Sequence, residues 1–340
     1  MNDKNAIIIT GGYLHTNSAK TAHGLIRGTE RFTIMGIIDE QSAGQDAGEV
    51  LDGIHRAIPV YDSIDSFLAT GREAAYCIIG VATKGGVIPP NLRNMLKQAL
   101  EKDFHLVNGL HEYITDIPEL ASLASERALQ IIDVRKPKKV KDLHFWSGAI
   151  REVKCPKIAV LGTDCALGKR TTTRFLVELM RKAGYKAEMI YTGQTGWMQG
   201  ARYGFVFDST LNDFISGEME HAIVSCYREV KPDIIFIEGQ SSLRNPSGPA
   251  GAEWIVSAAA DGVILQHDPA RKQYKEMEFY PAFIADPKDE IALISMYGAA
   301  TLALTVNTAK MKGDDARMYA REAEAALQIP VVLPLEDGLQ

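Results

Sequence analysis

A glycine-rich loop between an apolar run and an amphipathic segment has the residue types of a phosphate-binding site. The stretch VLGTDCALGKRTTT starts at Val160 and carries a lysine after its last glycine. Such a loop between a buried strand and a helix directs several backbone N–H groups at one point, and the helix dipole adds to their attraction for an anion. The residues expected to bind cofactor phosphates are Gly162, Thr163, Asp164, Cys165, Ala166, Leu167, Gly168, Lys169, Arg170 and Thr171.

The loop departs from the strict nucleotide-binding motif in two respects. Five residues separate Gly162 from Gly168, where the strict pattern has four, and Arg170 stands where a Ser or Thr would hold magnesium. Thr171 lies about 100° further around the helix and does not simply replace that hydroxyl. A ligand whose phosphates serve only for binding, such as coenzyme A, fits a cation at this position better than magnesium-assisted phosphoryl transfer does.

Two other strand-like runs end in side chains that could move a proton. Glu238 ends the run IIFIE, and His267 ends the run VILQH. The carboxyl ends of parallel strands meet at one edge of a sheet, so both side chains should face the phosphate loop. Either could accept a proton from a substrate ammonium group, and Glu238 could instead hold a cation. We therefore expect Glu238 or His267 to be the catalytic base. The alternatives are that Glu238 only caps the turn after it, and that His267 is a structural residue before a turn that starts at Asp268 and Pro269.

Polar residues in the same turns could bind a substrate. TGQTG closes the run at residues 187–191, and its amides are candidate donors to an oxyanion, with an ordinary tight turn as the alternative. Arg244 and Arg271 are candidate clamps, because a guanidinium binds a carboxylate through two hydrogen bonds. The predicted substrate-binding residues are Thr192, Gly193, Gln194, Thr195, Gly196, Gln240, Arg244 and Arg271.

Alternating strand-like and helix-like segments must position these residues. The strand-like runs cover residues 6–10, 33–39, 75–81, 104–107, 158–161, 187–191, 234–237, 262–266, 302–307 and 331–333, and the clearest helical pattern covers residues 90–102. This alternation predicts an α/β protein with two doubly wound, mainly parallel sheets. We expect a Rossmann-like domain over residues 1–145 and a P-loop NTPase-like domain over residues 146–340.

The first of these domains has only a weak dinucleotide-binding signal. Gly11 and Gly12 follow its first strand and Asp39 ends its second, but there is no GxGxxG. GVATKGGVIP, at residues 80–89, and NGLHE, at residues 108–112, close two further strands at the edge where open sheets bind ligands. We expect this domain to hold part of a substrate or a subunit contact.

Composition and charge argue against several classes of partner. The 340 residues carry a net charge of −6 and one short basic run, at residues 135–141, so nothing indicates nucleic-acid binding. No run reaches the roughly 18 apolar residues of a membrane span, and the chain starts without a signal-peptide pattern. The four cysteines form no CxxC pair, and the histidines lack metal-ligand spacing. We expect a cytoplasmic homo-oligomer that acts on a small molecule and binds no structural metal.

Several motifs resemble known families. GTDCALGK is similar to the GTDT-x-x-GK loop of dethiobiotin synthetases, including its longer spacing, and IEGQSS is similar to their VEGAGG turn. The whole chain more closely resembles a bacterial family described as a domain of unknown function, with a Rossmann-like N-terminal half and a P-loop C-terminal half. One branch of that family is D-glutamate N-acetyltransferase. The segments that carry this likeness are GVATKGGVI, NGLHEYITDIPEL, DVRKP, GTDCALGK, TGQTG, DFISGE, IEGQSSL and HDPARK.

This resemblance implies transfer of an acetyl group from acetyl-coenzyme A to the amino group of an acidic amino acid such as D-glutamate. Gly162, Gly168 and Lys169 would bind the phosphates of the coenzyme. The chain differs from the acetyltransferases after GQSSL, where it has RNPSGPAG, and again after HDPARK. The amino-acid substrate therefore stays open.

Two other functions fit the same residues. One is an ATP- and magnesium-dependent ligase or kinase of the dethiobiotin synthetase type, with Thr171 or Asp164 assisting the magnesium ion and Glu238 as a second metal carboxylate. The other is a regulatory protein that senses a nucleotide without turning it over. Magnesium-dependent binding of ATP without binding of coenzyme A would favour the ligase.

Overall fold

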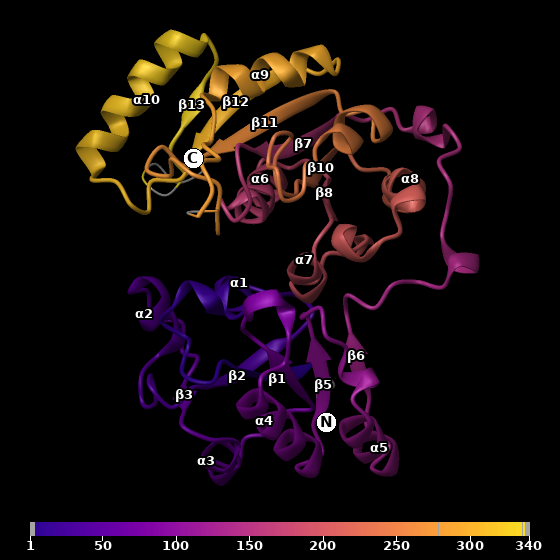
Figure 1. Ribbon diagram of the computed structural model, residues 1–340, viewed down its shortest axis with the longest axis vertical. Coiled ribbons are helices and arrows are strands. Elements are labelled where there is room, and N and C mark those ends of the chain that lie inside the picture. The colour runs from indigo at the N-terminus through magenta and orange to yellow at the C-terminus, as the bar shows by residue number, and fades with distance from the viewer. Residues whose placement is uncertain (1–3, 278, 335, 337–340) are drawn as a thin grey trace. The chain divides into compact units, whose positions relative to one another are not determined.

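The computed structural model describes residues 4–277, 279–334 and 336, which divide into two compact units (Figure 1). The first unit contains the residues up to Pro137 together with Gln194–Ala201, and the second contains Lys138–Gly193 and the residues from Arg202 onward. The chain therefore passes between the units three times. The division at residue 145 expected from the sequence counted Gln194–Ala201 with the second half.

A parallel sheet with the strand order β3-β2-β1-β4-β5-β6 forms the centre of the first unit (Figure 1). Its strands are β1 (Asn5–Ile9), β2 (Thr33–Ile38), β3 (Val60–Tyr61), β4 (Tyr76–Ile79), β5 (His105–Asn108) and β6 (Ile131–Asp133). Strand β1 pairs with β2 on one side and with β4 on the other. The order of the strands thus reverses between β1 and β4, and open α/β sheets bind ligands at the carboxyl ends of such a pair.

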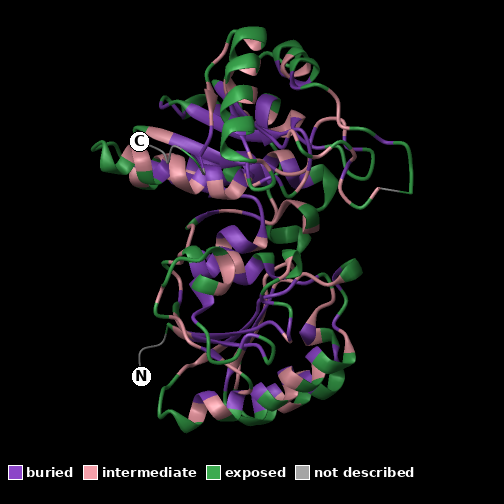
Figure 2. Ribbon diagram, turned by 90° about the vertical axis from the view of Figure 1, so that its left-hand side faces the viewer, coloured by how far each residue is buried: buried purple, intermediate pink, exposed green. Residues whose placement is uncertain are grey.

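Helices cover both faces of this sheet (Figures 1 and 2). The helices of this unit are α1 (Lys20–Arg27), α2 (Ala47–Asp52), α3 (Ile64–Ala69), α4 (Pro90–Glu101), α5 (Pro118–Glu126) and α7 (Gln194–Met198). Leu92, Leu96 and Leu100 of α4 are buried at helical spacing, and Pro90 suits the first turn because that turn needs no N–H donor there. The helix expected at residues 90–102 is confirmed.

Helix α7 comes from the middle of the chain but belongs to the core of the first unit. The side chain of Met198 is fully buried in that core. Gln199 donates through Nε2 to the carbonyl of Gly24 at 2.8 Å, and the guanidinium of Arg31 lies 4.1 Å from the centre of the Trp197 ring. The first unit therefore depends on a segment that follows it by more than fifty residues in the chain.

The second unit contains another parallel sheet, with the order β13-β12-β11-β7-β10-β8-β9. The strands are β7 (Lys157–Gly162), β8 (Ala187–Tyr191), β9 (Tyr203–Gly204), β10 (Ile234–Glu238), β11 (Gly262–His267), β12 (Thr301–Val306) and β13 (Val331–Val332). The helices are α6 (Lys169–Lys182), α8 (Asn212–Val230), α9 (Pro287–Met296) and α10 (Gly313–Leu327). Strand β7 lies between β10 and β11. The predicted α/β class with two parallel sheets is confirmed.

Two buried carboxylates of α8 fix the segment that leads into the second unit. Glu218 accepts hydrogen bonds from Lys138 and from the backbone and ring of His144, and Glu220 accepts from Ser147 and from the amide of Ile150. A Cβ atom on Gly217 would lie 1.9 Å from the carbonyl oxygen of His144. Glycine is therefore required where this segment crosses the helix.

Within the described ranges, the structure contains no helix with both the length and the apolar character needed to cross a membrane.

Candidate phosphate-binding site

The glycine-rich loop connects the end of β7 to the start of α6. Strand β7 ends at Gly162, where a Cβ atom would lie only 3.1 Å from Cδ of Lys169 and 3.2 Å from the carbonyl oxygen of Gln266. Gly168 has a φ of +109° immediately before the first helical residue, a conformation that favours glycine. A side chain at position 162 would therefore crowd Lys169 and the neighbouring strand, and one at position 168 would strain the backbone.

The backbone amides of the loop fall into two groups. Those of Thr163 and Cys165 donate to protein acceptors, at 3.1 and 2.7 Å. Those of Ala166, Leu167 and Gly168 have no protein acceptor in the described part of the chain. Since three consecutive free amides lead into the positive end of α6, the second group is available to an anionic ligand.

Lys169 is the first residue of α6, and its side chain is buried. The ammonium group donates to the carbonyl oxygens of Asp164, at 2.6 Å, and Ser241, at 2.8 Å. Burial lowers the pKa of Lys169 to about 8, against the opposing effect of the nearby carboxyl groups of Asp164 and Glu238. A phosphate beside this group would favour its charged form.

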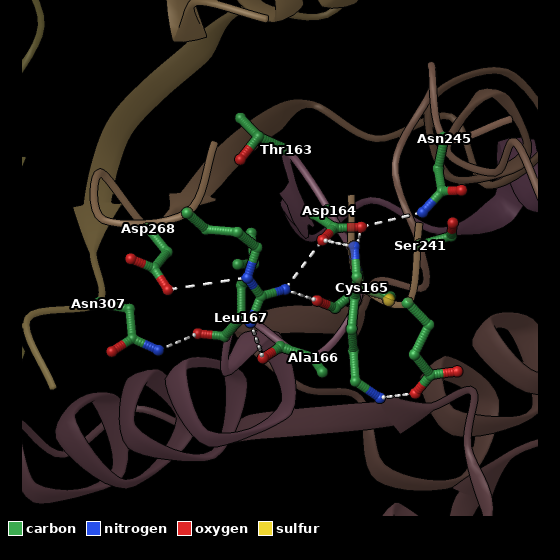
Figure 3. Close-up of polar contacts among 12 residues, drawn as sticks. Thr163, Asp164, Cys165, Ala166, Leu167, Ser241, Asn245, Asp268 and Asn307 are labelled. Carbon is green, nitrogen blue, oxygen red and sulfur yellow. Dashed lines mark hydrogen bonds and ion pairs between the residues drawn. The ribbon is translucent and has the colours of Figure 1, made fainter. Parts of the chain in front are cut away.

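Asp164 is fully buried and joins the loop to two other turns of the same unit (Figure 3). One carboxylate oxygen accepts from Nδ2 of Asn245 at 2.9 Å. The other accepts from Arg271 and from the amide of Lys275, both at 2.9 Å. Arg271 also donates to the carbonyl of Cys165 at 2.7 Å. In this structure Arg271 therefore holds the loop, rather than extending toward a substrate.

Glu238 ends β10, the neighbour of β7. Its carboxylate accepts from the amide of Thr192 at 3.1 Å, while its carbonyl accepts from the Thr192 hydroxyl and from the ring N–H of Trp254, both at 2.7 Å. Burial raises the pKa of Glu238, although the charge of Arg170 and the amides of Thr192 and Gly193 oppose this rise. Glu238 is thus a buried carboxylate made more basic than usual.

His267 lies at the end of β11, on the other side of β7. Its Nδ1 is 2.9 Å from the hydroxyl oxygen of Thr163, and the side chain is buried. Burial lowers the pKa of His267 to about 4, so the ring is neutral at pH 7. The structure therefore places both candidate bases next to the loop. Burial makes Glu238 a stronger base than an exposed carboxylate and makes His267 a weaker base than an exposed imidazole.

The other predicted substrate residues are distributed over both units. Thr192 and Gly193 lie beside Glu238, and Nε2 of Gln240 donates to the Thr192 hydroxyl at 3.2 Å. Arg244 donates through Nε to the buried Glu290 at 3.1 Å. The predicted residues that begin helix α7, and so belong to the first unit, are Gln194, Thr195 and Gly196.

Several residues that support this site were not expected from the sequence. Asn245 and Lys275 bind Asp164, Asn307 donates to the carbonyl of Leu167 at 2.9 Å, and Gln266 accepts from the hydroxyl of Thr172 at 2.6 Å. Only the position of Gln266, next to His267 at the end of a strand, could have indicated its role. Among the residues that the structure describes, no three His, Cys, Asp or Glu side chains gather in an arrangement that could hold a metal ion.

A glycine-rich loop between a central parallel strand and a helix, with a lysine at the first helical position, defines the second unit as a P-loop domain. The chain belongs to the DUF1611 family. Residues 144–340 match its C-terminal part, described as a P-loop domain of unknown function, and residues 40–137 match its N-terminal part, described as a Rossmann-like domain. The family expected from the sequence motifs is confirmed.

Similar proteins with names or solved structures cover most of the chain. A D-glutamate N-acetyltransferase from Tritonibacter scottomollicae is 30% identical over 280 residues, which are 79% of this chain and 80% of that protein. One from a Pseudoalteromonas species is 26% identical over 267 residues, 77% and 78% of the two chains. The crystal structure of a DUF1611 protein from Anabaena variabilis has a TM-score of 0.88 and 29% identity, and covers 98% of this chain and 96% of its own.

Proposed function

We propose that the protein is an N-acyltransferase that transfers an acetyl group from acetyl-coenzyme A to the amino group of an acidic amino acid, with D-glutamate the first substrate to test. The observation that carries this proposal is the 30% identity to a D-glutamate N-acetyltransferase over about four fifths of both chains. Arg170, in place of the usual magnesium-binding hydroxyl, supports a role of the loop in binding phosphates without transferring them.

The chemistry of the loop fits a coenzyme diphosphate. The free amides of Ala166, Leu167 and Gly168 and the ammonium group of Lys169 supply donors and positive charge on one short segment. Charge-assisted hydrogen bonds of this kind are the stronger ones in proteins. When bound, acetyl-coenzyme A would supply the activated acetyl group. The loop residues would only hold and orient it.

Glu238 is the proposed general base. Burial raises the pKa of its carboxyl group, which makes the ionised form a better proton acceptor, whereas His267 has a pKa of about 4 and is a weak base. Glu238 would take a proton from the substrate ammonium group, so that the nitrogen can form the new amide bond. The amides of Thr192 and Gly193 orient this carboxylate and are not free to act as oxyanion donors.

An assay with purified protein tests the reaction. D-Glutamate, L-glutamate, D-aspartate and L-aspartate are each mixed with acetyl-coenzyme A, the released thiol is followed with a disulfide reagent, and the N-acetyl product is identified by mass spectrometry. We expect thiol release and product with at least one of the four, and losses of at least 100-fold in kcat for Glu238→Gln. No product from any acidic amino acid, together with magnesium-dependent binding of ATP, would instead support the ligase alternative.

A further inference from the structure

The first unit contains a pocket that is lined by neither the residues of the phosphate loop nor Glu238. It has a volume of about 390 Å³ and lies at the carboxyl ends of β1 and β4, where the strand order reverses. Gly11, after β1, and Val81, after β4, line it together with Leu92 and Met95 of α4. This is the position at which open parallel sheets bind ligands. The volume is near the lower end of the roughly 300–1,000 Å³ typical of small-molecule sites.

In this kind of sheet an acidic residue at the end of the second strand would bind the ribose of a dinucleotide, but here that residue, Asp39, is hydrogen-bonded to the protein itself. Asp39 follows β2 and is buried. One of its carboxylate oxygens accepts from the hydroxyl of Thr10 at 2.6 Å and from the amide of Leu14 at 2.9 Å, and the other accepts from the amide of Ser42 at 3.1 Å. Because the carboxylate is buried and its bonds hold the loops after β1 and β2, Asp39 is not exposed to a ribose.

The pocket is held open by hydrogen bonds in the loop after β4. The amide of Ala82 donates to the carbonyl of Ser18 at 2.7 Å, which joins this loop to the segment before α1. Further along, the amide of Ile88 donates to the carboxylate of Glu112 at 2.6 Å, and the Thr83 hydroxyl donates to the carbonyl of Val87. The walls are therefore held by the protein's own hydrogen bonds, and small-molecule sites are usually largely pre-formed in this way.

The lining favours an apolar ligand with one negative charge. Leu92, Met95 and Val81 provide an apolar surface. Lys84 is the one charged side chain among the described residues that line the pocket, and it makes no ion pair or hydrogen bond within the described ranges. A single ammonium group balances a monocarboxylate, whereas a phosphate monoester would keep a second charge without a partner.

We propose that this pocket binds a small monocarboxylate with an apolar body, the carboxylate meeting Lys84 and the hydrocarbon part covering Met95 and Leu92. This site is separate in chemistry from the phosphate loop. It stands whether or not the protein is an acyltransferase, because its test does not use activity.

Nuclear magnetic resonance of the full chain, labelled with ¹³C in the methionine methyl groups, tests the proposal. Met95→Leu identifies the Met95 signal, and the probes are 3-phenylpropionate, 4-methylpentanoate and hexanoate. We expect at least one carboxylate to shift the Met95 methyl signal saturably and the corresponding neutral amide to bind at least tenfold more weakly. Lys84→Met should weaken binding of the carboxylate at least tenfold but leave binding of the amide nearly unchanged. Lys97→Met, on α4 but outside the pocket, is the matched control and should bind as the wild type does.

Three results would overturn the proposal. The first is the absence of a saturable shift of the Met95 signal with all three carboxylates. The second is equal affinity of wild-type protein and Lys84→Met for the carboxylate that binds. The third is a saturable shift with NAD⁺ or AMP but with none of the carboxylates, which would assign the pocket to a nucleotide. Lys84 is exposed and has no partner among the described residues, so its replacement should not affect folding.

Discussion

Binding of acetyl-coenzyme A should take up a proton at Lys169. Burial lowers the pKa of this side chain to about 8 in the free protein. Within the described ranges, its ammonium group donates to the carbonyl oxygens of Asp164 and Ser241. A bound phosphate favours the charged lysine and raises its pKa. If binding restores the ordinary value of 10.5, uptake is about 0.75 proton at pH 8.5 and about 0.1 proton at pH 7.

Calorimetry measures this uptake directly. Acetyl-coenzyme A is titrated into the protein at pH 8.5 in Tris and in a buffer with a much smaller enthalpy of ionisation, and the difference in binding enthalpy gives the number of protons. Phosphate buffer is avoided because it would compete for the loop. Since the bound form holds the proton more tightly, affinity should also fall as the pH rises above 8, by up to about tenfold per pH unit.

Lys169→Met should remove the proton uptake and weaken binding by about 2–4 kcal/mol, as expected for the loss of a charged hydrogen-bonding partner at a partly buried site. Lys182→Met, at the exposed far end of α6, is the matched control and should keep both properties. Equal binding enthalpies in the two buffers, or the same proton uptake in Lys169→Met, would refute the assignment of Lys169 to the phosphates.

Three further substitutions test the structure. Glu238→Gln should lower kcat for acetyl transfer at least 100-fold, yet raise the free energy of unfolding at pH 7 by about 1 kcal/mol, because burial of an ionised carboxylate destabilises the folded protein. Urea denaturation at pH 7 measures this gain. The gain should shrink as the pH falls and the wild-type carboxyl group becomes protonated. Gly217→Ala should lower the free energy of unfolding by about 2 kcal/mol in the same assay, because the new methyl group would overlap the backbone at His144. Gly248→Ala is the control and should lower it little, because no atom lies within 4 Å of the added carbon. Equal losses in the two variants would contradict the close packing at Gly217. Met198→Ala should destabilise the first unit by about 3 kcal/mol. Hydrogen exchange should show reduced protection of the backbone amides in β1, β2 and β4 but not in the sheet around β7. An equal loss of protection in both sheets would argue against the place of Met198 in the core of the first unit.

Much of the fold could be predicted from the sequence because long apolar runs alternate with helical patterns. The run at residues 187–191 coincides with β8, and the helix expected at residues 90–102 with α4. Strands β3, β6 and β9 have only two or three residues, too few to show a period. The path of TGQTG was missed for a different reason. A helix as short as α7 is determined by the core it enters, and the sequence does not say which core that is.

The residues of the candidate site also differ in how well the sequence predicts their roles. The phosphate loop has a local signature, because the glycines and the lysine are needed within a few residues of each other. Arg244 and Arg271 have no such local signature. Arg271 binds Asp164 across 107 positions of the chain, and Arg244 binds Glu290 across 46. The sequence does not distinguish an arginine that binds a substrate from one that binds a buried carboxylate of the protein itself, because both follow the end of a strand. Only the fold reveals that both guanidinium groups have carboxylate partners.

The excursion of the chain through α7 determines how this protein can be synthesised and divided. When Pro137 leaves the ribosome, the first core still lacks Met198, so it stays incomplete until residue 201 has also emerged. By then the strand and helix of the phosphate loop, β7 and α6, have been made as well. No single cut in the gene gives two whole halves. A fragment ending at Pro137 would present an open apolar surface to water, and its counterpart would expose the apolar side chains of Trp197 and Met198.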